Sequence, residues 1–109
     1  MDFWTYQQKA LKTATYRKNA MGPIYPTLGL VGEAGEVAEK IKKVLRDNNG
    51  VFSEERVDEI AGELGDVLWY IAMLAYELDL NLNEIALANL SKLISRQQRD
   101  KLHGSGDKR

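Results

Sequence analysis

Apolar residues recur at intervals of three and four along most of this chain, which predicts helices, and no segment alternates convincingly as a strand would. A first helix is expected over residues 2–19. A second should run from a cap at Thr27 to the turn-forming residues 47–50. Ser53 can cap a third helix, and residues 81–84 resemble the capping box that begins a fourth. The pattern therefore predicts an all-α protein.

The third predicted helix becomes more apolar along its length. Its apolar stripe begins at Val57 and widens until residues 67–76 are apolar almost all the way round, as in a helix that is buried on several sides. The short connections favour antiparallel neighbours. We therefore expect one domain over residues 1–109, an antiparallel four-helix bundle-like protomer, with a flexible tail at residues 101–109.

Composition narrows the function classes. The net charge of −1 does not suggest a surface for nucleic acid, and the absence of cysteine excludes thiolate metal sites and cysteine nucleophiles. The N-terminus lacks the apolar region of a signal peptide, and residues 67–76 are too few to span a bilayer. We expect a cytoplasmic protein without membrane contact. A chain of 109 residues would also gain stability from forming a dimer.

Two matching motifs place carboxylates directly after glycines within expected helices. Glu33 and Glu36 lie in GLVGEAGE, and Glu63 and Asp66 lie in GELGD. A glycine inside a helix costs roughly 1 kcal/mol relative to alanine, so something other than helix propensity keeps these glycines in place. They either clear a surface for a ligand or allow close helix contact, and both readings stay open. Acids three residues apart share one helix face.

The two acid pairs fall in register across the expected hairpin. Glu36 lies 14 residues before Gly50, and Glu63 lies 13 residues after it. Both pairs should therefore stand about 20 Å from the turn, facing each other. Crowded carboxylates beside an apolar segment repel one another unless a cation neutralises them. We expect a Mg²⁺ site formed by all four acids, with Mn²⁺ as an alternative metal. The competing interpretation is a solvated face with ordinary ion pairs such as Glu36 with Lys40.

Three stretches of the chain together resemble the MazG-like all-α nucleoside triphosphate pyrophosphohydrolases. They are LGLVGEAGEVAEKIKK (28–43), DEIAGELGDVLWYIAMLA (58–75) and NLSKLISR (89–96). The resemblance implies a Mg²⁺-dependent enzyme that splits a nucleoside triphosphate into monophosphate and pyrophosphate and assembles as a homodimer or homotetramer. It assigns Glu33, Glu36, Glu63 and Asp66 to the metal and the catalytic site.

A triphosphate substrate needs further contacts. Lys92 and Arg96, four residues apart, match the family's KLxxR segment. Tyr70 shares a face with Asp66, and Asn89 precedes Lys92 by one turn. Tyr25 is the preferred candidate for stacking on a base. The other aromatic candidates for that role are Trp4, Tyr16 and Trp69. The glycine-rich tail either closes over phosphates or is flexible.

The general base stays open. Many members of the family carry two adjacent acids where this chain has Gly32 and Glu33, and Glu39 and Glu59 are alternatives for the missing acid. The single histidine, His103, lies in the tail, which argues against a ferritin-like di-iron site. Two rival functions remain: phosphoribosyl-ATP pyrophosphohydrolase, and a non-enzymatic helical dimerisation or partner-binding module.

Overall fold

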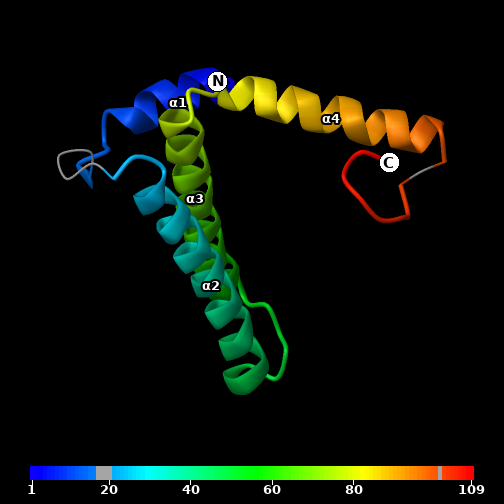
Figure 1. Ribbon diagram of the computed structural model, residues 1–109. Helices are drawn as coiled ribbons and strands as arrows, with labels where there is room; N and C mark the ends of the chain where they lie inside the picture. The colour runs from blue at the N-terminus through cyan, green and yellow to red at the C-terminus, as the bar shows by residue number, and fades with distance from the viewer. Residues whose placement is uncertain (17–20, 101) are drawn as a thin grey trace.

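The described residues of the chain form four α-helices (Figure 1). The computed structural model describes residues 1–16, 21–100 and 102–109. The helices are α1 (Phe3–Leu11), α2 (Ile24–Asp47), α3 (Glu54–Glu77) and α4 (Leu82–Gln98). Over these described ranges there is no strand, and the predicted all-α class is confirmed.

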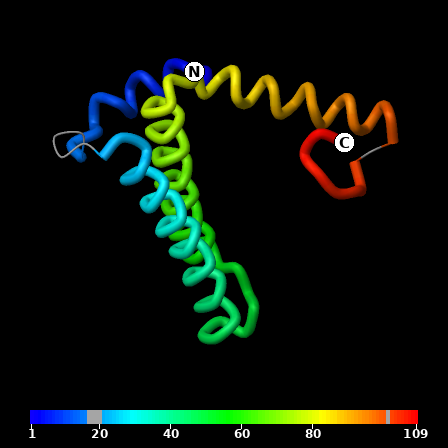
Figure 2. The backbone as a smooth tube through the Cα atoms, viewed as in Figure 1, coloured from blue at the N-terminus to red at the C-terminus, as the bar shows by residue number. Residues whose placement is uncertain are grey.

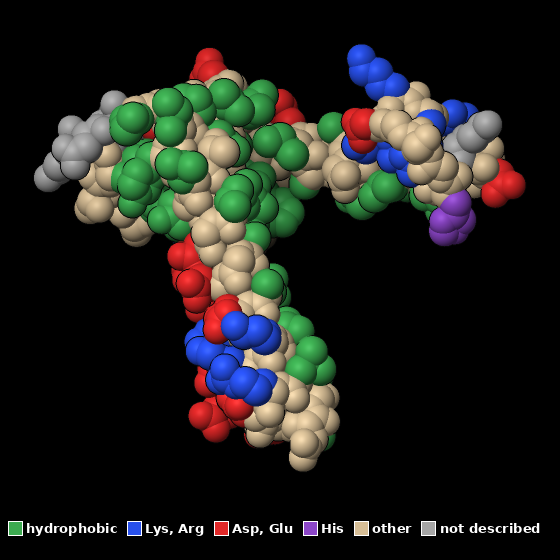
Figure 3. All heavy atoms as spheres, turned by 60° about the horizontal axis from the view of Figure 1, so that its bottom comes forward, with side chains coloured by type: hydrophobic (Ala, Val, Ile, Leu, Met, Phe, Trp, Pro, Cys, Tyr) green, Lys and Arg blue, Asp and Glu red, His purple; other side chains and the backbone are tan. Residues whose placement is uncertain are grey.

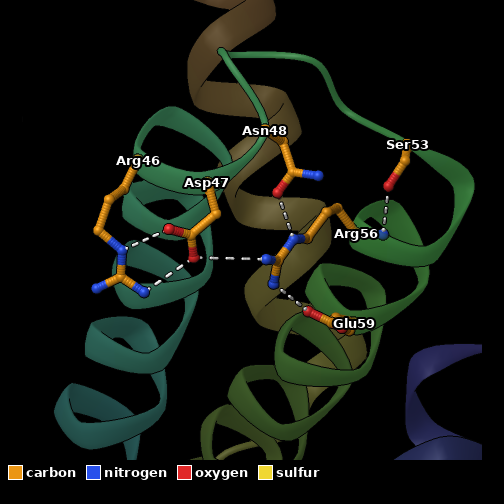
Figure 4. A network of polar contacts seen from close by, with 6 residues as sticks. All are labelled: Arg46, Asp47, Asn48, Ser53, Arg56 and Glu59. Atoms are coloured by element: carbon orange, nitrogen blue, oxygen red, sulfur yellow. Dashed lines mark hydrogen bonds and ion pairs between the residues drawn. The ribbon is translucent and has the colours of Figure 1, made fainter.

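The two long helices α2 and α3 form an antiparallel hairpin, which Figures 1 and 2 show as the stem of the molecule. Arg56 fastens the turn between them (Figure 4). Its guanidinium donates from Nε to Oδ1 of Asn48 at 3.0 Å and from Nη1 to Oε2 of Glu59 at 3.1 Å. Its Nη2 also lies 3.8 Å from Oδ2 of Asp47. One cation thus ties the end of α2 to the beginning of α3, which fixes the register of the hairpin.

Two of the predicted helix starts are confirmed. Ser53 Oγ accepts from the backbone N–H of Arg56 at 3.2 Å, and Asn81 Oδ1 accepts from that of Asn83 at 2.8 Å. The predicted cap at Thr27 is wrong, because α2 begins at Ile24. Pro26 lies in the first turn of that helix, where its missing N–H would have had no partner within the helix.

The first helix is shorter than predicted and ends at Leu11 instead of continuing to residue 19. Thr13 Oγ1 donates to the carbonyl of Ala10 at 2.7 Å and accepts from Trp69 Nε1 at 2.9 Å. The chain therefore leaves the helix to make contacts with α3 that no local pattern encodes. Residues 17–20 of the predicted helix lie outside the described residues.

The core lies where α1 crosses the open end of the hairpin. Ala10, Ala72, Met73 and Leu82 form its buried cluster. Gln7 is 1% exposed and joins three segments. Its Nε2 donates to the carbonyls of Ala72 (3.3 Å) and Leu80 (3.0 Å), and its Oε1 accepts from the N–H of Leu82 (3.0 Å). A satisfied buried amide of this kind fixes the angle between α1, α3 and α4.

Helix α4 points away from the hairpin as a separate arm, and residues 102–109 return alongside it (Figures 1 and 2). Many large apolar side chains remain exposed on the hairpin and on this arm, among them Val31 (67%), Leu64 (54%) and Leu90 (55%). Among the described residues, no helix is both long and apolar enough to cross a membrane.

Candidate metal centre

Three of the four predicted ligands meet across the hairpin. Glu33 on α2 and Glu63 and Asp66 on α3 each offer one carboxylate oxygen, and these oxygens lie within 4.8 Å of one another. Each acid sits in the middle of a long helix, so the backbone that carries it is held on both sides. The register argument therefore predicted this meeting of α2 with α3.

The carboxylates of this cluster repel one another. The pKa of Glu33 is raised, first by a hydrogen bond with Glu63, next by burial, and then by the negative charges of Asp66, Glu63 and Glu36. A hydrogen bond between two carboxyl groups requires a proton, so this contact favours the protonated form of Glu33. Oxygen ligands alone, with excess negative charge, suit a hard divalent cation such as Mg²⁺. The residues present therefore fit a metal of this class.

Glu36 stands apart from the cluster of three. It lies one turn beyond Glu33 on α2 and is exposed, and its carboxylate is not among the three that converge. Its charge still contributes to the raised pKa of Glu33. The described protomer thus brings three of the predicted ligands together, and Glu36 is outside this group.

The glycines of the two motifs serve different purposes. A methyl group added at Gly29 would overlap the ring of Tyr70, so this glycine allows a close contact between α2 and α3. A methyl group at Gly32, Gly35, Gly62 or Gly65 would meet nothing within 4 Å. Of the two interpretations left open by the sequence, close helix contact is confirmed at Gly29. The other four glycines border open space, and a ligand in that space stays a prediction.

Tyr70 connects the acids to a group of aromatic rings. Burial and a hydrogen bond with Tyr25 raise its pKa, and the negative charges of Glu33 and Asp66 add to the effect. Its ring meets that of Trp69 edge-on at 5.0 Å and lies 6.4 Å from that of Tyr25. Tyr70 is therefore close to the carboxylates, as its spacing from Asp66 predicted, and remains protonated at neutral pH.

Tyr25 lies in the first turn of α2 and stacks on Tyr16, with centroids 4.8 Å apart and planes 9° apart. Trp69 meets Tyr16 edge-on at 6.1 Å. Three of the four aromatic candidates for base stacking are thus in one cluster beside Tyr70. Trp4 lies on α1 and lines a different hollow with Gln7 and Tyr76.

Sequence reasoning missed one neighbour of the acids. The pKa of Tyr6 on α1 is raised first by burial and then by the negative charge of Asp66, so the charge of this acid reaches the phenol. No local sequence pattern predicts this interaction between Tyr6 and Asp66, because it depends on the way α1 crosses the hairpin.

The remaining predicted site residues lie elsewhere in the described protomer. Asn89, Lys92 and Arg96 are on α4, and Figures 1 and 2 show that the C-terminal half of this helix is distant from the middle of the hairpin. Figure 3 likewise shows the cationic side chains near the histidine at the end of this arm, apart from the acids of the stem. Among the described residues of one chain, Lys92 and Arg96 therefore lie apart from the carboxylates of Glu33, Glu63 and Asp66.

The two alternatives for the missing acid are engaged in ion pairs. Glu39 Oε2 lies 2.9 Å from Lys42 Nζ, and Glu59 Oε2 lies 3.1 Å from Arg56 Nη1. Glu59 belongs to the turn network of Figure 4. Neither belongs to the converging group.

Comparison with known proteins finds one matching family model and a similar phage protein. The model of the MazG nucleotide pyrophosphohydrolase domain matches residues 25–99. The Gene 37 protein of Mycobacterium phage L5 is 49% identical over 109 aligned residues, which cover 95% of this chain and 96% of the phage protein. No solved structure matches. On the evidence of its motifs and of this match across most of its length, the chain belongs to the MazG nucleotide pyrophosphohydrolase domain family.

Proposed function

We propose that this protein is a Mg²⁺-dependent nucleoside triphosphate pyrophosphohydrolase, which converts a (deoxy)nucleoside triphosphate to the monophosphate and pyrophosphate and so controls nucleotide pools. The observation that carries the proposal is the group of three carboxylate oxygens from Glu33, Glu63 and Asp66 within 4.8 Å of one another. It lies beside a surface cleared by glycines and in a chain of this family.

Glu33, Glu63 and Asp66 would hold the divalent cation, and in this proposal Glu36, one turn from Glu33 on α2, is the fourth ligand. The bound cation supplies charge neutralisation for the triphosphate and a more acidic water. The chain itself must orient the phosphates, accept a proton from the attacking water and stabilise the leaving pyrophosphate. In this proposal one of these carboxylates also accepts that proton as the general base.

The aromatic cluster supports recognition of a nucleoside. Tyr25 is 46% exposed and already stacks on Tyr16, so in this proposal its exposed surface receives the base. Tyr70, held protonated between the aromatic cluster and the acids, can donate its hydroxyl hydrogen to a phosphate oxygen.

A homodimer or homotetramer is part of the proposal. Val31, Leu64 and Leu90 expose large apolar surfaces on the hairpin and on the α4 arm, and surfaces of this kind mark contacts between protein chains. Assembly would also let the α4 arm of one protomer bring Lys92 and Arg96 to the carboxylates of another. That would supply the cations that a triphosphate needs.

The decisive experiment is a substrate panel with identification of the products. The purified protein is incubated with Mg²⁺ and with canonical and modified nucleoside triphosphates, and the products are separated by ion-exchange chromatography. We expect monophosphate and pyrophosphate. Asp66→Asn should lower kcat by more than about tenfold, because loss of a ligand costs at least as much as loss of its outer partner. Asp58→Asn, which changes an exposed acid elsewhere on α3, is the matched control.

The same panel separates the rivals. Pyrophosphate release from phosphoribosyl-ATP alone would replace the proposed substrate class. If no nucleotide yields monophosphate in the presence of Mg²⁺, the proposed enzymatic activity is refuted. That result would favour a non-enzymatic helical module. Full activity of Asp66→Asn would show that the site is misplaced.

A further inference from the structure

The C-terminal segment, residues 102–109, folds into a loop against α4. Arg109 donates from Nη2 to the carbonyl of Leu102 at 2.7 Å and from Nη1 to that of Gly106 at 2.6 Å. Arg99, directly after α4, donates from Nη2 to the backbone oxygen of Arg109 at 2.9 Å. Gly106 has φ +88°, a conformation suited to glycine. The loop is therefore closed by its own arginine and attached to the helix by another.

This loop and α4 enclose a basic pocket of about 290 Å³. Of the described residues that line it, five are cationic and only Asp107 carries an acidic side chain. Three cations come from the helix arm and two from the loop: Lys92, Arg96, Arg99, Lys108 and Arg109. A concave surface with this excess of positive charge attracts anions.

Asp107 is paired with two of the pocket's cations. Its Oδ1 lies 2.6 Å from Lys92 Nζ and 3.3 Å from Arg96 Nη2, and Arg96 also donates to its backbone carbonyl. The hydrogen bond from Lys92, followed by that from Arg96, lowers the pKa of Asp107. The side chain of Arg96 is only 6% exposed, whereas that of Asp107 is 77% exposed. A buried guanidinium is thus neutralised by a carboxylate on the outer surface.

We propose that this pocket binds a polyphosphate chain, and that the carboxylate of Asp107 occupies the position of one phosphate group until the chain displaces it. The choice of a polyphosphate rests on the proposed function. The new elements are the loop residues: Lys108 is a ligand-binding residue, and Asp107 is an intramolecular competitor.

Physical chemistry favours such an exchange. The ion pair between Lys92 and the exposed Asp107 contributes little to stability. Arg96, in contrast, must keep an anionic partner because it is buried. A phosphate group offers more charge than a carboxylate and matches the guanidinium fork in two places. Arg99 and Lys108, which line the same pocket, can then engage the neighbouring phosphate.

Isothermal titration calorimetry with inorganic pyrophosphate tests this proposal. The full chain is titrated in EDTA at low salt, so that the metal-dependent carboxylate cluster contributes nothing. We expect pyrophosphate to bind, Asp107→Asn to bind it about two- to fivefold more tightly, and Lys108→Gln to bind it more weakly by a similar factor. These neighbouring residues should therefore change affinity in opposite directions.

Two control variants isolate the effect of position from that of charge. Asp100→Asn removes an acid at the end of α4, and Lys42→Gln removes a cation on α2; both should leave the affinity unchanged. Equal affinities of wild type, Asp107→Asn and Lys108→Gln would overturn the proposal, as would tighter binding by Lys108→Gln. Competition by inorganic tripolyphosphate, and none by a nucleoside, should accompany the expected result.

The experiments distinguish a wrong ligand for the pocket from a wrong proposed function. A protein that hydrolyses nucleoside triphosphates but does not bind pyrophosphate in EDTA would refute the pocket alone. Pyrophosphate binding without hydrolysis would refute the activity alone. Tighter binding of a single-stranded oligonucleotide than of pyrophosphate would replace the ligand class and overturn the proposal.

Discussion

Single residues decide how the two long helices approach each other. Gly29 lies directly under the ring of Tyr70, whereas Gly32 faces open space one turn later on the same helix. The same substitution should therefore have opposite effects at two positions of one motif. The ring of Tyr70 cannot move freely, because it also contacts Trp69 and Tyr25.

Gly29→Ala should lower the free energy of unfolding by about 1–3 kcal/mol, the usual cost of overpacking. Gly32→Ala should raise it by up to about 1 kcal/mol, the difference in helix propensity. Urea denaturation followed by circular dichroism measures both. Equal effects of the two substitutions would show that Gly29 and Tyr70 are not in contact.

The metal-free cluster should respond to pH through Glu33. Its pKa is raised in the folded protein, so the stability that it contributes is present at low pH and is lost as pH rises through the raised value. In EDTA, raising the pH from below 4.5, the ordinary pKa of a glutamate, to about 8 should lower the Tm of wild type more than that of Glu33→Gln. Addition of Mg²⁺ should raise the Tm of wild type and have little effect on the variant. Identical pH profiles in EDTA would contradict the shared proton.

At the scale of elements, one amide joins α1 to the turn between α3 and α4. Gln7 is fully satisfied within the core, so its loss leaves two carbonyls and one N–H without their partner. Gln7→Leu should lower the free energy of unfolding by about 1–3 kcal/mol. Gln8→Leu, at the adjacent and less buried position, should change it much less. Urea denaturation compares the two variants.

The loop of residues 102–109 should separate from α4 in acid. The cations of α4 hold the pKa of Asp107 below its ordinary value. The contact is therefore complete above that ordinary value and is lost as pH falls through the lowered one. Limited proteolysis with pepsin across its acidic working range should cut the loop of wild type more readily as pH falls, whereas cutting of Asp107→Asn should follow only the pH dependence of pepsin itself. Protection of wild type that does not change with pH would contradict this expectation.

At the scale of the whole molecule, the hairpin and the arm leave apolar surface that a second copy could cover. Val31→Asp or Leu90→Asp would place a charge in that contact, so each should shift the protein to monomer in sedimentation velocity. Gln97→Asp, at an exposed polar position on α4, should leave the assembly unchanged. A wild-type protein that is monomeric at all concentrations would contradict the proposed oligomer.

By itself, the sequence determined the helices, their antiparallel pairing and the meeting of Glu33 with Glu63 and Asp66, because helical periodicity and residue counts from Gly50 set heights along a hairpin. It also predicted the caps at Ser53 and Asn81, since capping is a local interaction.

Only the tertiary structure decided the early end of α1, the placing of Gly29 against Tyr70, the course of α4 and the return of Asp107 to Lys92 and Arg96. Each depends on contacts between residues distant in the chain or on a loop without periodicity. A pattern of spacing shows which residues share a face, but packing decides what that face meets.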